Sequence, residues 1–138
     1  MQWVVYALLS AFFAALTSIL AKIGIENVNS NLATAIRTVV VLFMAWTVVF
    51  VADKHHEIVT VSPKSWLFLV LSGCATGLSW LFYFKALQIG EASKVMPIDK
   101  FSVVIGMVLA FVVLGETADL KTVTGGLLIT TGVVVLIL

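Results

Sequence analysis

Five long apolar stretches occupy nearly all of this 138-residue chain and leave too little sequence for a water-soluble body. Leu, Val, Ile and Phe continue for about twenty residues at a time, the length that a helix needs to cross a bilayer. The chain is 62% hydrophobic and only 11% charged, far from the composition of a soluble domain. We therefore predict an all-α, polytopic membrane protein with five transmembrane helices.

Bulk features exclude several functional classes. A net charge of +1 gives no electrostatic basis for binding nucleic acid, and we expect no such partner. The one cysteine, Cys74, allows neither a disulfide framework nor a thiolate metal cage within one chain. His55 and His56 are adjacent in a loop and cannot share one helical face, which argues against a metal site. The sequence contains no nucleophile–base pair or phosphate loop, so we predict neither enzyme activity nor a cofactor.

Polar turns and capping residues mark the borders of the spans. Ser62-Pro63 reads as an N-cap followed by a proline at the first helical position, and Asp119 can cap the last span. The fourth span is unusual, because its apolar part, 101–114, is too short to cross a bilayer, and extending it back to Pro97 brings Asp99 into its first turn. We predict one transmembrane domain, residues 1–138, with spans at about 3–24, 32–52, 64–89, 97–114 and 121–138.

The basic residues show no bias toward either side of the membrane. Five spans place the termini on opposite faces. Leaving aside Arg37 and Lys85, which lie inside spans, three basic residues fall on each face: Lys54, Lys64 and Lys121 against Lys22, Lys94 and Lys100. The positive-inside rule then gives no orientation, and such a chain can insert both ways.

The third span carries a stripe of hydroxyl side chains. At 100° per residue, the members of the stripe lie within about 60° of one another: Ser65, Ser72, Thr76, Ser79 and Tyr83. Beside it, Gly73 and Gly77 form a close-approach motif for two helices. Packing alone would explain small and hydroxyl residues, but a tyrosine favours a water-accessible lining. Tyr6 and Ser10 give a weaker match on the first span.

Ionisable residues inside the spans are costly and usually face protein or water. Arg37 lies about one turn inside the second span, where it either snorkels to the surface or lines an interior site. Lys22 is interpreted as a snorkelling anchor. Asp99, just after Pro97, is either an acid that the helix macrodipole favours or a polar group that a broken helix presents to a cavity.

A series of short motifs runs from the third span into the fourth. It comprises an aromatic-rich helix ending in Ala86-Leu87, a small-residue turn at 90–93, Pro97-Ile98, and Gly115-Glu116 at the end of the fourth span. This pattern resembles the EamA-like family of the drug/metabolite transporter superfamily. Lys22 and Arg37 match basic positions common near the ends of that family's first two helices. The five-span layout is similar to one whole repeat.

The resemblance implies a secondary carrier in a bacterial or archaeal cell membrane, often an exporter of amino acids, metabolites or drugs that works by alternating access. Typical members have ten helices, arranged as two inverted repeats around a central cavity. This chain has one repeat, and Asp99-Lys100 stands where a second proline is often found. The resemblance implies that members this short assemble in pairs, so the expected partners are a small-molecule substrate, the bilayer and a second copy of the chain.

We therefore expect an antiparallel homodimer that restores the inverted-repeat geometry. The predicted substrate-binding residues are Tyr6, Ser10, Arg37, Ser72, Thr76, Ser79 and Tyr83. Arg37 would bind a carboxylate or phosphate if the substrate is anionic. Pro97 and Asp99 are the predicted coupling or gating residues, because Asp99 is the only acid near a span interior.

Two alternatives remain open at the level of sequence. A proton-coupled small multidrug carrier needs an embedded acid in its first helix, and residues 1–24 contain none. A non-transporting membrane scaffold would pack through the glycines of the third and fifth spans and would have a dry interior.

Overall fold

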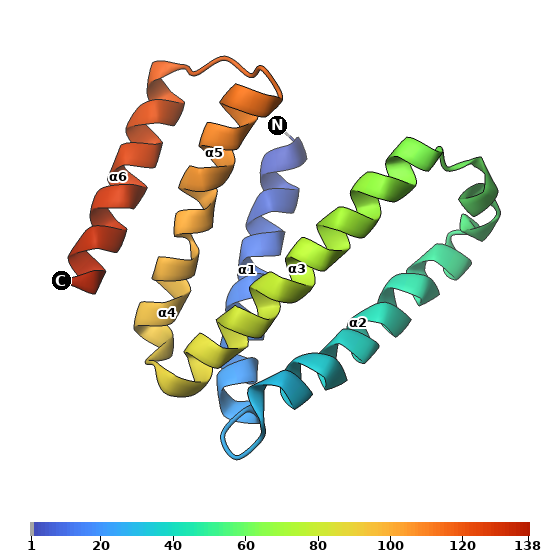
Figure 1. Ribbon diagram of the computed structural model, residues 1–138, viewed down its shortest axis with the longest axis horizontal. Coiled ribbons are helices and arrows are strands. Elements are labelled where there is room, and N and C mark those ends of the chain that lie inside the picture. Colours follow the sequence, from blue (N-terminus) through green and yellow to red (C-terminus); the bar gives the residue numbers. More distant parts are fainter. Residues whose placement is uncertain (1) are drawn as a thin grey trace. The chain divides into compact units, whose positions relative to one another are not determined.

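The computed structural model describes residues 2–138 as helices joined by short connections (Figure 1). The chain divides into two compact units, the first ending at Gln88 and the second beginning at Ile89. The first unit contains α1 (Gln2–Gly24), α2 (Ser30–Val51), the 3₁₀ helix η1 (His55–Thr60) and α3 (Pro63–Ile89). The second contains α4 (Ala92–Asp99), α5 (Phe101–Val113) and α6 (Leu120–Ile137).

Five helical stretches are long and apolar enough to cross a membrane, which confirms the predicted all-α, five-span class. They are Gln2–Gly24, Ser30–Val51, Pro63–Ile89, Ala92–Val113 and Leu120–Ile137. Most of their large apolar side chains lie on the surface of the chain. In a membrane protein, lipid or another protein chain must cover such a surface.

Side-chain caps explain where several helices begin. The Oδ1 atom of Asn29 accepts a hydrogen bond of 2.9 Å from the Asn31 N–H at the start of α2. Ser62 is the residue immediately before α3, and its Oγ atom accepts a hydrogen bond of 3.1 Å from the Ser65 N–H. Asp119 caps α6 by accepting from the backbone of its first turn at 3.2 Å. The capping roles predicted for Ser62 and Asp119 are confirmed.

The fourth span begins earlier than predicted. Its first helix, α4, starts at Ala92, so Pro97 lies inside the helix instead of at its first position. Proline lacks an N–H and its ring crowds the preceding turn, which interrupts a helix. The interruption falls at Lys100, whose N–H donates to the Pro97 carbonyl at 3.1 Å. Asp99 therefore lies at a break within the span and not in its first turn.

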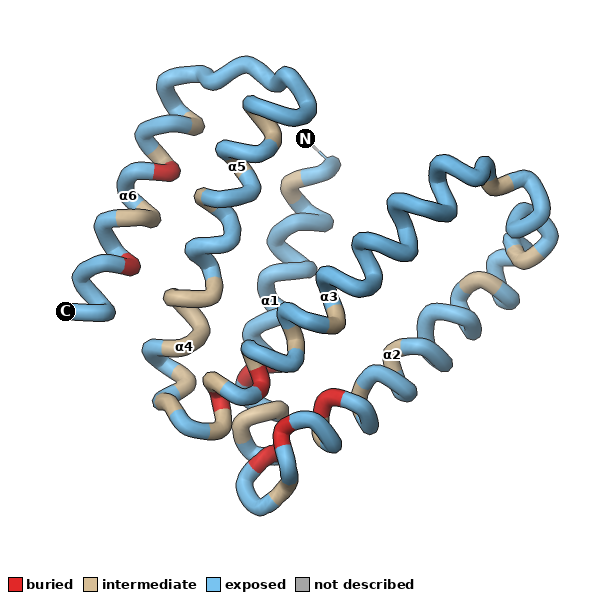
Figure 2. Tube along the Cα trace, viewed as in Figure 1, coloured by how far each residue is buried: buried red, intermediate tan, exposed pale blue. Residues whose placement is uncertain are grey.

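The long helices of the first unit meet at one end only. The buried residues of this unit all lie there: Ser18, Ile25, Ser30, Thr34, Phe84 and Leu87. Figure 2 shows these buried positions gathered where the end of α1, the start of α2 and the end of α3 come together. We call residues 17–37 and 80–88 the joined end of the unit. Residues 3–13 and 64–79, which are almost all exposed, form its open end.

In the second unit α6 runs antiparallel to α5 as a hairpin and also packs on α4 (Figure 1). Gly126 and Val133 of α6 are buried. A Cβ atom added to Gly126 would lie 3.4 Å from the Met107 sulfur, so the two helices approach closely at this point. Gly115, with φ of +69°, adopts the left-handed conformation that lets the chain leave α5.

Candidate functional site

Arg37 is positioned by two aromatic rings of α3. Its guanidinium carbon lies 4.7 Å from the ring centroid of Trp80 and 4.7 Å from that of Phe84. Both distances are within the range of a cation–π interaction. Trp80 and Phe84 are four residues apart and therefore share one face of α3. The side chain that the sequence left between snorkelling and an interior site is thus held against a neighbouring helix.

The charge of Arg37 has no acidic partner within residues 2–138. The ion pairs of the described chain involve other residues: Lys54 with Glu57, His55 with Asp53, Lys94 with Glu91, and Lys100 with Asp99. Arg37 is only half-buried, and aromatic faces offset a cation only in part. The guanidinium is therefore available to an anion, which it can bind through two parallel N–H groups.

A cavity of about 390 Å³ adjoins Arg37 at the joined end. Its walls come from the last turns of α1, the turn that follows, the first turns of α2, and Phe84 of α3. Arg37 is its one charged lining residue and Thr17 its one side-chain hydroxyl. A mostly apolar wall with few polar groups is typical of small-molecule sites, and this volume lies in their usual range. We call this space the Arg37 cavity.

Tyr83 makes a hydrogen bond that connects α3 to α1. Its hydroxyl oxygen lies 2.6 Å from Ser18 Oγ, and Ser18 Oγ also donates to the Ala14 carbonyl at 2.9 Å. A serine hydroxyl has one proton, so Tyr83 is the donor in the first bond. Sequence reasoning missed Ser18. The available signal was the spacing of Ala14, Ser18 and Lys22, which places them on one face of α1.

Two further polar contacts complete the joined end. Lys22 Nζ donates to the Leu87 carbonyl at 2.6 Å, and Gln88 Nε2 donates to the Val28 carbonyl at 2.8 Å. Leu87 belongs to the last turn of α3, whose carbonyls lack donors within the helix and favour a nearby cation. Lys22 therefore caps α3, whereas the sequence suggested an anchor that snorkels to the membrane surface.

The predicted substrate-binding residues separate into two groups. Arg37 and Tyr83 both lie at the joined end, beside Phe84. The others are exposed at the open end, with no helix of the first unit covering them: Tyr6, Ser10, Ser72, Thr76 and Ser79. Thr76 Oγ1 donates to the Ser72 carbonyl of its own helix at 2.9 Å. Beside this stripe, a Cβ atom added to Gly73 or Gly77 would meet nothing within 4 Å, so the close-approach surface has no partner helix in the described chain.

The predicted gating residues belong to the second unit. Pro97 and Asp99 are half-buried, and one Asp99 carboxylate oxygen lies 3.3 Å from Lys100 Nζ. Both residues lie in the last turn of α4, just before the interruption at Lys100.

Comparison with known proteins gives consistent results over the whole chain. The profile of the EamA-like transporter family matches residues 1–138. The chain is also 43% identical over 135 residues to a protein of Sinorhizobium sp. described as "Uncharacterized transporter in cobO 3'region". That alignment covers 98% of this chain and 96% of the relative. No solved structure matches.

Proposed function

Because this chain belongs to the EamA-like transporter family, a family of transporters and not of enzymes, we propose that it is a secondary exporter of small organic molecules that carry an anionic group. Amino acids, organic acids and phosphorylated metabolites belong to this class, and some drugs do as well. The observation that carries the proposal is Arg37, a half-buried cation with no carboxylate within ion-pairing distance in residues 2–138, lining a cavity of about 390 Å³. The substrate's carboxylate or phosphate would be its counter-ion.

The proposed assembly is an antiparallel homodimer. One chain supplies five candidate spans, and the basic residues near the span ends show little bias between the two faces: Lys54, Lys64 and Lys121 on one face, and Lys22 and Lys94 on the other, since Lys100 lies at the break within the fourth span. A second copy in the opposite orientation would cover the exposed open end and enclose the five polar side chains there in a shared cavity. Gly73 and Gly77, which have free space beside them, would permit close approach of the second copy. The proposed location is the cell membrane of a bacterium or archaeon.

In this proposal the interruption at Lys100 serves alternating access. A helix broken beside Pro97 bends there more easily than an intact one, so the two segments of the fourth span can move separately. Asp99 is the proposed proton-coupling group, with Lys100 as its partner when it is ionised.

The central experiment measures transport by purified protein in liposomes. The panel contains amino acids, organic acids, phosphorylated metabolites and cationic dyes. We expect uptake or efflux of at least one anionic or zwitterionic class, and its loss in the Arg37→Gln variant. Lys85→Gln, which removes an exposed cation from α3, is the matched control and should retain transport. Transport of cationic dyes alone, unaffected by Arg37→Gln, would contradict the proposal.

A second experiment tests the assembly. Reporters that are active in one compartment only are fused to each terminus. We expect both orientations in comparable amounts, and a single fixed orientation would rule out the antiparallel form.

The scaffold alternative has one observation in its favour, the bond of Thr76 to its own helix. It predicts that cysteines at Ser72 and Ser79, in a chain without Cys74, resist water-soluble thiol reagents in the membrane. Rapid labelling would favour the transporter.

A further inference from the structure

The loop between α2 and α3 brings together the only two histidines of the chain and an aspartate. Each of Asp53, His55 and His56 offers one ligand atom, and these atoms all lie within 4.8 Å of one another. The two imidazole rings lie against each other with their centroids 3.8 Å apart and their planes tilted by 42°. The sequence argument against a metal site assumed that adjacent histidines point apart, and in η1 they do not. We propose that this loop binds a divalent transition-metal ion through Asp53, His55 and His56.

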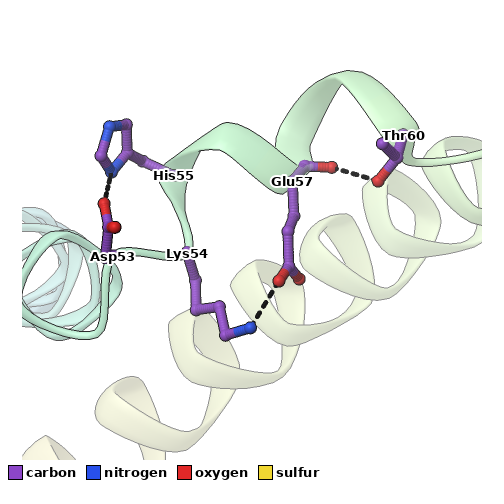
Figure 3. A network of polar contacts seen from close by, with 5 residues as sticks. All are labelled: Asp53, Lys54, His55, Glu57 and Thr60. Atoms are coloured by element: carbon purple, nitrogen blue, oxygen red, sulfur yellow. Dashed lines mark hydrogen bonds and ion pairs between the residues drawn. The ribbon is translucent and has the colours of Figure 1, made fainter.

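The distance between Asp53 and His55 fits two ligands of one ion better than a hydrogen bond. His55 Nδ1 lies 3.6 Å from Asp53 Oδ1, beyond the usual range of an N–H···O bond (Figure 3). In a tetrahedral site with ligands about 2.0–2.2 Å from the metal, two ligand atoms are roughly 3.4 Å apart. His55 Nδ1 is also buried and has no hydrogen-bond partner among the described residues. A buried ring nitrogen that faces a carboxylate oxygen is satisfied either by a proton between the two atoms or by a metal ion that binds both.

The surroundings hold the ligands in place. The His55 ring packs on Phe50 with 5.2 Å between centroids, and Phe50 packs on Trp46 at 5.8 Å. Asp53 has φ of +53°, a conformation that aspartate tolerates better than most residues and that turns the chain sharply after α2. In Figure 3 the Asp53 carboxylate and the His55 ring point toward each other. The first two ligands therefore need little reordering on binding.

The lysine next to Asp53 in the sequence does not pair with the aspartate. Lys54 pairs with Glu57 at 2.6 Å, and Figure 3 shows this pair separate from the Asp53–His55 pair. Its ammonium is thus held by another carboxylate, and Asp53 keeps its charge for a metal. Two imidazoles and one carboxylate suit Zn²⁺, Ni²⁺ or Cu²⁺ better than Mg²⁺ or Ca²⁺, which prefer oxygen ligands only. Water would fill the remaining coordination positions. A bound ion would connect the end of α2 to η1, outside the spans.

The test is metal binding by the full-length protein in detergent, purified with a tag that contains no histidine and treated with a chelator. Titration with Co²⁺, followed by its visible absorption, and displacement by Zn²⁺ report ligand type and affinity together. We expect one ion per chain. His55→Ala, His56→Ala and Asp53→Asn should each weaken binding about tenfold or more, because losing even an outer-shell partner of a metal ligand costs 10- to 100-fold.

Glu116→Gln is the matched control, since it removes an exposed carboxylate from another loop without touching the cluster or the Lys54–Glu57 pair, and its affinity should equal that of the unaltered protein. Gel filtration and circular dichroism establish that each variant is folded. Equal affinities in all variants, or binding no tighter than that of the His55→Ala/His56→Ala double variant, would mean an adventitious ion only and would overturn the proposal. The assay does not involve transport, so its failure would leave the proposed transport function unaffected.

Discussion

The two units of this chain hold their helices together in different ways. In the first unit, hydrogen bonds from polar side chains join the helices beside the buried apolar residues: Tyr83 donates to Ser18, and Lys22 donates to the Leu87 carbonyl. In the second unit, α5 and α6 meet at Gly126 and Met107, and no side-chain hydrogen bond joins these two helices in the described part of the chain. Polar groups at membrane depth are costly, and they persist mainly where function requires them. The contrast is consistent with the proposed function, which places the substrate site in the first unit and leaves the hairpin a supporting role.

The hydroxyl groups of the two units differ in the same way, because those of α6 bond within their own helix and one in the first unit bonds to another helix. Three threonines of α6 donate to carbonyls of their own helix, at 2.6–2.9 Å: Thr124, Thr130 and Thr131. Such bonds satisfy a hydroxyl inside a bilayer without recognising anything. Ser18 makes the same local bond to Ala14, but it also receives the proton of Tyr83 from another helix. A bond between helices fixes their relative orientation, and a local bond does not.

The largest expected effect comes from Arg37 in the first unit. Hydrogen bonds to charged groups contribute about 1.5–3 kcal/mol, so Arg37→Gln should lower kcat/KM for an anionic substrate roughly 10- to 150-fold. Arg37→Lys keeps the charge but loses the planar pair of parallel N–H donors. Its kcat/KM should therefore lie between those of the unaltered protein and the Arg37→Gln variant. Thermal unfolding in detergent should change little by comparison. Initial transport rates over a range of substrate concentrations provide the measurement.

In the hairpin of α5 and α6, we expect a substitution to lower stability and to leave substrate affinity unchanged. Gly126→Leu places extra volume against Met107, and overpacking of this kind costs about 1–3 kcal/mol of unfolding free energy. Substrate affinity per folded molecule should remain unchanged. Gly126→Ala is the control, because its Cβ contacts only the end of a flexible side chain. If Gly126→Leu altered the affinity and left stability intact, the division of roles between the units would be wrong.

A smaller effect is expected from the bond between Tyr83 and Ser18. Hydrogen bonds between membrane helices contribute about 0.6 kcal/mol on average, and up to about 1.7 kcal/mol. A double-mutant cycle of Tyr83→Phe and Ser18→Ala should give a coupling energy in this range. The hydroxyl of Thr131, which bonds to the Leu127 carbonyl of its own helix, provides the comparison. A cycle of Tyr83→Phe with Thr131→Val should give no coupling.

The smallest effect concerns pH and the cap of α6. Hydrogen bonds from the side chain and backbone of Thr122 lower the pKa of Asp119 below its usual value. A carboxylate with a lowered pKa in the folded state stabilises the fold above its unfolded pKa, and this contribution is lost as pH falls through the folded value. Thermal unfolding followed from neutral to acidic pH should show a slightly flatter dependence for Asp119→Asn than for the unaltered protein. Asparagine also caps helices, so the difference reports the charge alone.

The elements of the fold were predictable because each depends on local chemistry. Runs of apolar residues predicted five spanning helices, and Ser62-Pro63 and Asp119 predicted two of their starts. The start of the fourth span was predicted wrongly from Pro97, because a proline is compatible with the first position of a helix and also with an interrupted interior. The structure decides between these two positions, because the helix that contains Pro97 already begins at Ala92.

The site was harder to predict, because it depends on which helix faces meet. Arg37 was identifiable as a costly charge, but its neighbours Trp80 and Phe84 are ordinary aromatic residues of an apolar span. Ser18 and Lys22 lie about 100° and 140° around α1 from the face of Tyr6 and Ser10 that the hydroxyl pattern favoured. The stripe from Ser72 to Ser79 remains a prediction, since it lies at the open end, where a second chain would have to cover it.

The direction of one proton distinguishes the two predicted substrate-binding residues that lie at the joined end, Tyr83 and Arg37. Because Ser18 gives its proton to Ala14, the Tyr83 phenol gives its own to Ser18 and keeps only lone pairs to offer. Arg37, by contrast, has donors and no acceptor. Of these two side chains only Arg37 lines the cavity, so under the proposed function the molecule bound there must bring an electron-rich group that accepts hydrogen bonds.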